Sequence, residues 1–333
     1  MFVVTSLPVA ILFCVITMLG WGSWANTQKL SGKDKWRFEL YYWDYAIGVF
    51  LLSFVFAHTL GSFGSAGMGA VENMHSAAWR FVIPALVSGA IFNVANILLV
   101  VGIDAAGMTV AFPVGVGLAL VIGTVESYIG TPKGNPVLLF VGVGLILFAM
   151  VMSAFAYSKL PPVPGRRPLR GLLFSALAGC IMGSFYPQLM RSISPDFSTA
   201  PIQPGMLTPY VALVFFAGGV LASNLVVNTI FMRAGGVTYR DYFRGSFKLH
   251  LIGVLGGAIW MIALSFNVIA SAVAGPAISY ALGQGATLIA AIWGVLIWRE
   301  LEAGPKSTAR YVALMFAGYA AGLLLIGMAT TQT

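Results

Sequence analysis

Long apolar runs, separated by short polar connectors, follow one another along the chain of 333 residues. A helix needs about 20 mostly apolar residues to cross the hydrocarbon core of a bilayer. The runs that meet this length lie at 5–26, 43–61, 79–101, 107–129, 136–157, 170–190, 209–232, 247–267, 272–298 and 308–330. Because helices of this length satisfy their own backbone polar groups in lipid, the pattern predicts an all-α integral membrane protein with ten transmembrane helices.

Part of this pattern occurs twice. Residues 89–129 and 257–297 align without a gap at a separation of 168 residues, and both stretches begin with Gly-Ala-Ile. A weaker similarity pairs Gly22-Ser23-Trp24 with Gly183-Ser184-Phe185. Internal repeats in a membrane chain are typical of secondary transporters, whose substrate site lies between the two repeats.

Basic residues are distributed unevenly over the connectors. The connectors after spans one, three, five, seven and nine together hold fifteen of the eighteen Lys and Arg residues, and only Arg80, Lys133 and Arg191 lie on the other side. Because cytoplasmic connectors carry the excess of Lys and Arg, both termini are predicted to lie outside. We therefore expect a first five-helix repeat at 1–160 and a second, inverted repeat at 161–333, joined by the basic linker 159–170.

The composition agrees with a protein that has lipid as its solvent. The chain is 59% hydrophobic and 8% charged, with a mean hydropathy of +0.91. A soluble domain of this size cannot bury so much apolar surface. The net charge of +8 does not indicate a nucleic-acid partner, because the basic residues are spread over several connectors. The expected location is the bacterial inner membrane, which the chain crosses many times.

Polar and aromatic side chains within the spans are candidates for a binding site, because a polar group at membrane depth is costly without a partner. The substrate-binding candidates are Trp24, Asn93, Asn96, Asn224, Trp260, Tyr280 and Gln284. Amide groups together with aromatic faces suit a neutral polyhydroxy or amide ligand. The alternative, which also applies to Asn228, is that the amides are structural and form hydrogen bonds between helices.

Acidic residues within spans are rare, which makes them candidates for proton coupling. Glu126 lies inside span four, about one helical turn from its outer end, and Asp44 begins span two near the inner surface. The alternative for Glu126 is that its side chain reaches the outer interface or pairs with Arg80 or Lys133. His58 and His250 lie near span ends and rank behind these two carboxyl groups.

The sequence contains no motif for nucleotide binding, metal binding or serine hydrolase chemistry. The chain has no phosphate-binding loop with Lys-Ser/Thr, and its three histidines and two cysteines do not have metal-ligand spacing. Gly-x-Ser-x-Gly does not occur. We therefore expect no cofactor, no metal and no catalytic residue, although an intramembrane enzyme stays open as a different class of function.

Four short motifs resemble a known family. They are Trp21-Gly22-Ser23-Trp24 at the end of span one, Asp44-Tyr45-Ala46, Ile122-Gly123-Thr124, and Asn96 eleven residues before Gly107, where Ala95 replaces the glycine of the family motif. On these residues the chain resembles the ten-helix drug/metabolite transporter superfamily. The similar branch contains bacterial glucose/ribose uptake proteins, the rhamnose–proton symporter and plant ureide permeases.

The resemblance implies secondary active uptake, often proton-coupled, through a central cavity formed by helices one to four and six to nine. Glu126 has no counterpart in the matched motifs. The sequence thus predicts an alternating-access carrier that imports a small neutral polar metabolite, with a sugar or deoxysugar first and a ureide or nucleobase as the alternative.

Overall fold

The computed structural model describes residues 1–34, 36–64, 66–106, 108–161, 167–198, 201–299, 301–302 and 304–330, and its long elements are all helices. Among these residues, Ile193 and Leu207 form an isolated parallel β-bridge. Part of the expected linker 159–170 and residue 107, at the start of the predicted fourth span, lie outside the described residues.

Ten helical segments among the described residues are long and apolar enough to cross a membrane. They are α1 (Leu7–Ser23) with the 3-10 helix η1 (Trp24–Asp34), α2 (Phe38–His58), α4 (Trp79–Ala106), α5 (Met108–Gly130), α6 (Pro136–Tyr157), α7 (Pro168–Gly183) with α8 (Phe185–Met190), α9 (Pro209–Ala234), α11 (Phe247–Ala274), α12 (Pro276–Gly283) with α13 (Ala286–Ile292) and the π-helix η2 (Trp293–Ile297), and α14 (Thr308–Ala329). Two short helices, α3 (Ala70–Ser76) and α10 (Tyr239–Phe243), lie in connectors. The prediction of an all-α protein with ten spans is confirmed.

One predicted boundary is wrong. Asp44 does not begin the second span, because α2 starts at Phe38 and Asp44 lies in its second turn. The residues ahead of it, including Glu39, Tyr41 and Tyr42, are buried within the protein rather than facing lipid. A hydropathy pattern places the start of such a helix too late, because it does not register that polar and tyrosine side chains are tolerated where protein surrounds them.

The chain forms two compact units, which are described separately. Unit 1 comprises 1–94 and 188–273, and unit 2 comprises 95–187 and 274–333. The units therefore do not follow the predicted halves 1–160 and 161–333, since each unit takes segments from both halves. The division into two five-helix repeats stays a prediction.

Within unit 1, helices α4 and α9 cross in close contact. A Cβ atom at Gly89 of α4 would collide with the carbonyl oxygen of Phe216, and one at Gly219 of α9 would collide with that of Leu86. Small residues allow membrane helices to approach backbone to backbone, which increases van der Waals attraction where the hydrophobic effect no longer drives association.

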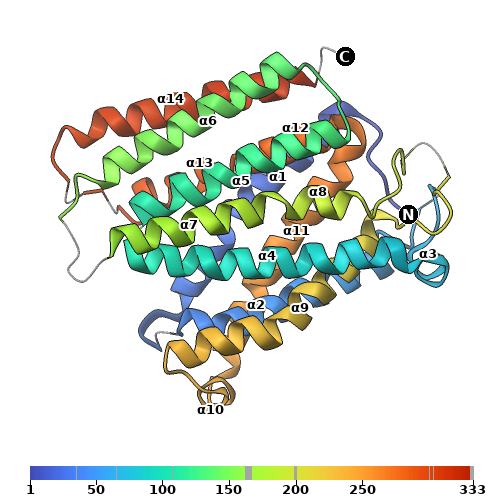
Figure 1. Ribbon diagram of the computed structural model, residues 1–333, viewed down its shortest axis with the longest axis horizontal. Helices are drawn as coiled ribbons and strands as arrows, with labels where there is room; N and C mark the ends of the chain where they lie inside the picture. The colour runs from blue at the N-terminus through green and yellow to red at the C-terminus, as the bar shows by residue number, and fades with distance from the viewer. Residues whose placement is uncertain are drawn as a thin grey trace. The chain divides into compact units, whose positions relative to one another are not determined.

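Helices α2 and α11, also in unit 1, cross in the same manner. Gly257 of α11 faces the carbonyl oxygen of Tyr45, and Gly48 of α2 faces that of Val254, again with no room for a Cβ atom. Helices α2 and α9 lie side by side in the same unit (Figure 1). Unit 1 is thus held in its middle by two glycine crossings.

Unit 2 contains two closely packed helix pairs, α6 with α14 and α5 with α7, and α12 also packs on α5 (Figure 1). Gly142 of α6 faces the carbonyl oxygen of Gly322 on α14. Span nine is not one continuous helix, because α12 ends at Gly283 and α13 begins at Ala286. Gln284 therefore lies at a break between two short helices.

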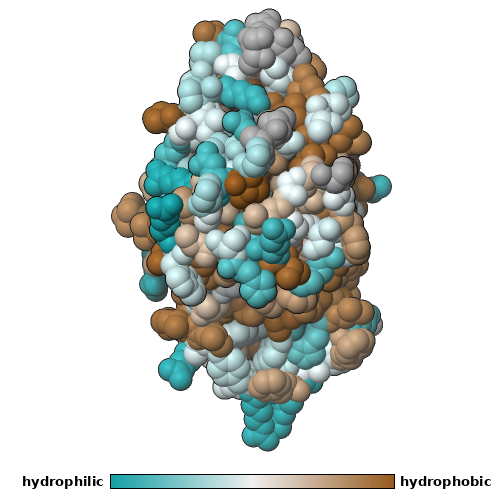
Figure 2. Space-filling model, turned by 90° about the vertical axis from the view of Figure 1, so that its right-hand side faces the viewer, coloured by the Kyte–Doolittle hydropathy of each residue, from teal (hydrophilic) through white to brown (hydrophobic). Residues whose placement is uncertain are grey.

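Many large apolar side chains point away from the protein. On α9, Leu225, Val226 and Ile230 are each more than 60% exposed. On the face drawn in Figure 2, where α3 lies, hydrophilic and hydrophobic residues are mixed. Outward apolar residues on long helices are suited to lipid and not to water. The chain is a multi-pass membrane protein.

Candidate functional site

A cluster of aromatic rings lies in the middle of unit 1. The ring of Trp260 on α11 lies 4.3 Å from that of Phe92, 5.9 Å from Phe216, 6.0 Å from Trp21 and 6.3 Å from Tyr45, measured between centroids. These rings come from α1, α2, α4, α9 and α11. Five separate segments therefore contribute to one aromatic surface, of which Trp260 is the common member.

Trp24 extends this surface at the junction of α1 and η1. Its ring lies 4.7 Å from that of Tyr45, and the two planes are tilted by 43°. The change from α-helix to 3-10 helix after Ser23 marks this junction. We refer to Trp21, Trp24, Tyr45, Phe92, Phe216 and Trp260 as the aromatic cluster.

Two polar atoms of the aromatic cluster are buried without a hydrogen-bond partner in the described part of the chain. They are the indole Nε1–H of Trp21 and the hydroxyl group of Tyr45. Most buried polar groups in proteins are paired, because an unpaired one costs about 1–3 kcal/mol. The cluster thus combines apolar ring faces with unused hydrogen-bonding capacity, as a site for a small polar molecule requires.

Three buried amides in unit 1 differ in how they are paired. Asn93 donates from Nδ2 to the Ser223 hydroxyl at 3.0 Å, and Asn228 donates to the backbone oxygen of Glu39 at 2.9 Å. Neither the Nδ2 nor the Oδ1 atom of Asn224 has a partner among the described residues, although the side chain is fully buried. Asn228 therefore makes a contact between helices, while both polar atoms of Asn224 have unused hydrogen-bonding capacity within the described chain.

The predicted site residues of unit 2 gather around Tyr280. The Tyr280 hydroxyl donates to the backbone oxygen of Ala119 on α5 at 3.2 Å, and its ring lies 5.1 Å from that of Tyr186. Both Gln284 and Glu126 interact with the Tyr280 side chain. Gln284, at the break between α12 and α13, is 9% exposed.

The sequence-predicted residues thus fall into two groups. Unit 1 holds Trp24, Asn93, Asn224, Trp260 and Asp44. Unit 2 holds Asn96, which is 7% exposed, together with Tyr280, Gln284 and Glu126. That all of them line one cavity stays a prediction.

Asp44 has polar partners that its position in the sequence did not suggest. Its carboxylate accepts a hydrogen bond from the Tyr242 hydroxyl at 2.6 Å, and its two oxygens lie 2.9 Å and 3.1 Å from Nδ1 of His250. Asp44 is 2% exposed, and His250 keeps 26% of its side chain exposed. Burial raises the pKa of Tyr242, and the carboxylate raises it further, so this hydroxyl remains a donor at neutral pH.

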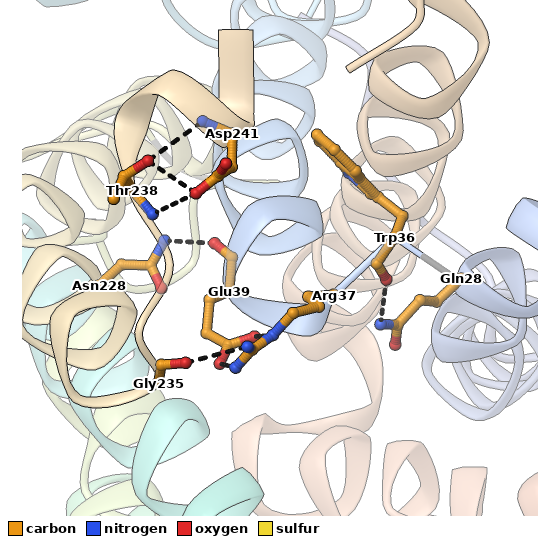
Figure 3. A network of polar contacts seen from close by, with 8 residues as sticks. All are labelled: Gln28, Trp36, Arg37, Glu39, Asn228, Gly235, Thr238 and Asp241. Carbon is orange, nitrogen blue, oxygen red and sulfur yellow. Dashed lines mark hydrogen bonds and ion pairs between the residues drawn. The ribbon is translucent and has the colours of Figure 1, made fainter. Parts of the chain in front are cut away.

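The end of unit 1 that holds Asp44 carries a second polar network (Figure 3). Arg37 forms an ion pair with Glu39, which is 7% exposed, and also donates from Nη1 to the backbone oxygen of Gly235 at 2.9 Å. Nearby, Thr238 and Asp241 form a capping box that starts α10. These contacts connect the start of α2 to the connector between α9 and α11, and we call this part of unit 1 the basic end.

Within the described residues there is no group of three or more His, Cys, Asp or Glu side chains that is able to hold a metal ion. Asp44, Glu39 and Asp241 are instead paired with nitrogen and hydroxyl donors.

Comparisons with known proteins identify the fold only. No family model matches the chain, and no curated protein matches it. A solved structure described as "Crystal structure of protein" is similar, with a TM-score of 0.59 and 16% sequence identity over 95% of this chain and 96% of that one. The ten-helix arrangement therefore occurs in a known structure of nearly equal length.

Proposed function

We propose that this protein is a secondary active carrier that imports a small neutral polar metabolite by alternating access, coupled to the proton gradient. The observation that carries the proposal is the aromatic cluster, in which ring faces adjoin the unpaired Trp21 and Tyr45 groups. Aromatic rings pack against the apolar faces of sugars, while unpaired polar groups supply hydrogen bonds to hydroxyls. A sugar or deoxysugar is the leading substrate class.

The two glycine crossings of unit 1 support an inverted repeat. Equivalent contacts are made by pairs of residues at constant separations, namely Gly89 and Gly257 or Leu86 and Val254 at 168, and Phe216 and Tyr45 or Gly219 and Gly48 at 171. Phe92 and Trp260, also 168 apart, have their ring centroids 4.3 Å from each other. A repeat related by a two-fold axis produces such matched contacts, and carriers place their sites at repeat interfaces.

Helix breaks give further support. The similar stretches Gly22-Ser23-Trp24 and Gly183-Ser184-Phe185 coincide with the junction of α1 and η1 and with the junction of α7 and α8. Span nine is interrupted at Gln284. Interrupted transmembrane helices form the substrate and ion sites of several carrier folds.

A screen for ligands tests the proposal. Purified protein is heated with D-glucose, L-rhamnose, allantoin or uracil, and the unfolding temperature is measured. We expect stabilisation by a sugar, and Asn96→Ala is expected to weaken its binding by about 1–3 kcal/mol because ligand polar groups lose a partner. Stabilisation by allantoin or uracil alone favours the ureide or nucleobase alternative, and chemical conversion of any of the four favours the intramembrane enzyme.

The proposed location is the bacterial inner membrane with both termini outside, so that the basic connectors lie in the cytoplasm. In a chain without Cys14 and Cys180, Lys159→Cys should react with an impermeant maleimide only after the cells are opened. Thr131→Cys is the matched control, at the opposite end of α6, and should react in intact cells. Reaction of position 159 from outside would contradict the orientation. The same holds for position 165, which lies outside the described residues.

A further inference from the structure

Asp44, His250 and Tyr242 form a compact acid–base group at the basic end of unit 1. They come from α2, α11 and α10, and both oxygens of the carboxylate face the same imidazole nitrogen. Gly253 lies against Asp44, and a Cβ atom there would lie 3.2 Å from Oδ2. Any larger residue would occupy the space that the carboxylate needs.

The geometry fixes how this group handles protons. Because Nδ1 of His250 lies between 2.9 Å and 3.1 Å from the two carboxylate oxygens, one proton is shared between the ring and Asp44. With that proton alone, the pair carries one negative charge. A second proton has to enter at the other ring nitrogen, Nε2, and it makes the pair neutral. Histidine is the side chain whose charge normally changes between pH 5 and pH 8.

Nε2 lies on the side of the ring away from Asp44. A Cβ atom at Gly245, in the connector between α10 and α11, would lie 2.9 Å from Nε2. The absence of a side chain there leaves space beside this nitrogen, and the partial exposure of His250 gives its ring contact with solvent at the basic end. Because Nδ1 is held by the buried carboxylate, Nε2 is the ring nitrogen left to exchange a proton.

Few other titratable groups face the pair. On α2 itself, Tyr41 interacts with Asp44 and bonds to Thr27 at 2.8 Å. From the segment before α2, the Trp36 ring meets the His250 ring edge-on at 5.4 Å. From α10 comes the Tyr242 hydroxyl, whereas Arg240 and Arg244 interact with Asp241. Lys248, on the first turn of α11, is exposed.

We propose that Asp44 and His250, positioned by Tyr242, are the proton-binding site that couples transport to the proton gradient. This inference rests on the proposed carrier function and assigns its coupling to unit 1 instead of Glu126. A proton that reaches the site from the outside bonds to the Nε2 lone pair, the imidazolium is stabilised by the Asp44 carboxylate, and the same proton leaves to water at the basic end, where His250 is partly exposed. No electron transfer or leaving group is involved.

The pair becomes neutral on loading, so the loaded state no longer buries a net charge at Asp44, which favours the change of state of the carrier. The Tyr242 bond also connects the charge state of Asp44 to α10 and its connector. Because the protonated imidazole is the stronger donor to the carboxylate, loading weakens the hydrogen bond from Tyr242 to Asp44. The contact between α10 and α2 is weakened with it.

A titration of the three histidines tests the proton site without any substrate. Protein carrying 13C-labelled histidine is placed in lipid nanodiscs, and the ring shifts of His58, His75 and His250 are followed with pH, with His250→Gln for assignment. In Asp44→Asn, we expect His250 to bind its outer proton on the order of tenfold more weakly, because a neighbouring negative charge is lost. His58 and His75 should not change.

Tyr242→Phe is the second variant, because it removes one hydroxyl from a partly exposed residue. His250 should then bind its proton more tightly, since the carboxylate has lost a competing donor. A purely structural role would not produce changes of opposite sign in the two variants. If His250 titrates identically in wild type, Asp44→Asn and Tyr242→Phe, the proton site is refuted.

The coupling is tested in liposomes that contain the pH-sensitive dye pyranine. On addition of L-rhamnose or D-glucose, wild type should acidify the interior and should also exchange the labelled sugar. His250→Gln should keep exchange within about twofold and lose at least about tenfold in acidification, in line with the loss of an essential proton carrier. Glu126→Gln and the matched histidine control His58→Gln should acidify normally.

The outcomes separate the two proposals. Wild-type acidification in His250→Gln, or its loss in Glu126→Gln alone, overturns the assignment to Asp44 and His250. A wild-type protein that exchanges neither the sugars nor allantoin is not the proposed carrier, and the coupling role falls with it. The histidine titration still decides separately whether the pair shares a proton.

Discussion

The basic end of unit 1 and the middle of the same unit are built from the same helices by different means. At the basic end, Arg37 pairs with Glu39, and Asp44 accepts bonds from Tyr242 and His250. In the middle, helices cross at glycines, aromatic rings stack, and the polar atoms of Trp21, Tyr45 and Asn224 are buried without partners in the described chain.

This difference distinguishes polar groups that hold the protein together from polar groups that await another molecule. Asn228 and Asn224 lie one turn apart on α9 and are both fully buried, yet only Asn228 has a partner, the backbone oxygen of Glu39. The sequence pattern, two asparagines at helical spacing in one apolar span, does not show which of them is paired. An unpaired buried amide is costly, so its retention favours a function that uses it.

The largest expected effect concerns the packing of the middle region. Gly219→Ala should destabilise the protein by about 2 kcal/mol or more, because the new methyl group collides with the backbone oxygen of Leu86. At Gly218, one residue away, a Cβ atom would meet only the Leu86 Cδ2 methyl group at 3.7 Å, so Gly218→Ala should be neutral or slightly stabilising. Unfolding in detergent measures both, and equal stability of the two variants would contradict the crossing.

A somewhat smaller effect is expected at the basic end. Arg37→Ala leaves the buried Glu39 carboxylate without its ion pair and should cost about 1–2 kcal/mol, since Arg37 is partly exposed and screened by solvent. The double variant Arg37→Ala/Glu39→Gln should recover part of this loss, because the charge to be paired is gone. If the double variant is no more stable than Arg37→Ala, the pair is not a stabilising contact.

The two amides of α9 provide a matched pair of variants. Asn228→Leu should lose about 1 kcal/mol of stability, because the Glu39 oxygen loses its donor, while Asn224→Leu should be neutral or stabilising. Sugar binding, measured by the thermal shift, should show the reverse order and weaken only in Asn224→Leu. The comparison between the two regions fails if both variants lose stability equally.

The smallest expected effect is the pH response of the capping box. Hydrogen bonds from Thr238 hold the pKa of Asp241 below its usual range. A lowered carboxyl pKa means that Asp241 contributes stability above its unfolded pKa and that this contribution is lost as the pH falls through the folded pKa. The stability difference between wild type and Asp241→Asn should therefore be small at neutral pH and vanish in acid, and a difference that grows in acid would contradict the cap.

The transmembrane pattern was predictable because span length is set by the bilayer and apolar runs record it directly. The start of α2 was not, because Glu39, Tyr41 and Tyr42 are buried by neighbouring helices that hydropathy does not register. The contact of Phe92 with Trp260 had a signal in the sequence, since the two occupy equivalent positions of the repeat.

The partnership of Asp44 with His250 had no such signal, because 206 residues separate them and no motif contains both. Glycine patterns were also insufficient to locate helix breaks. Gly283 and Gly285 flank the break at Gln284, while the equivalent Gly115 and Gly117 lie in the unbroken α5. The neighbours of a glycine pair decide whether the helix continues, and those neighbours come from distant sequence.

The break at Gln284 has a mechanical consequence for unit 2. A continuous rod such as α5 transmits a tilt at one end to the other, whereas two short rods joined at a pivot absorb the tilt at their joint. Segments with equivalent sequences in the repeat therefore differ in stiffness. The relative tilt of α12 and α13 can therefore change at Gln284, whereas α5 has no such joint between its ends.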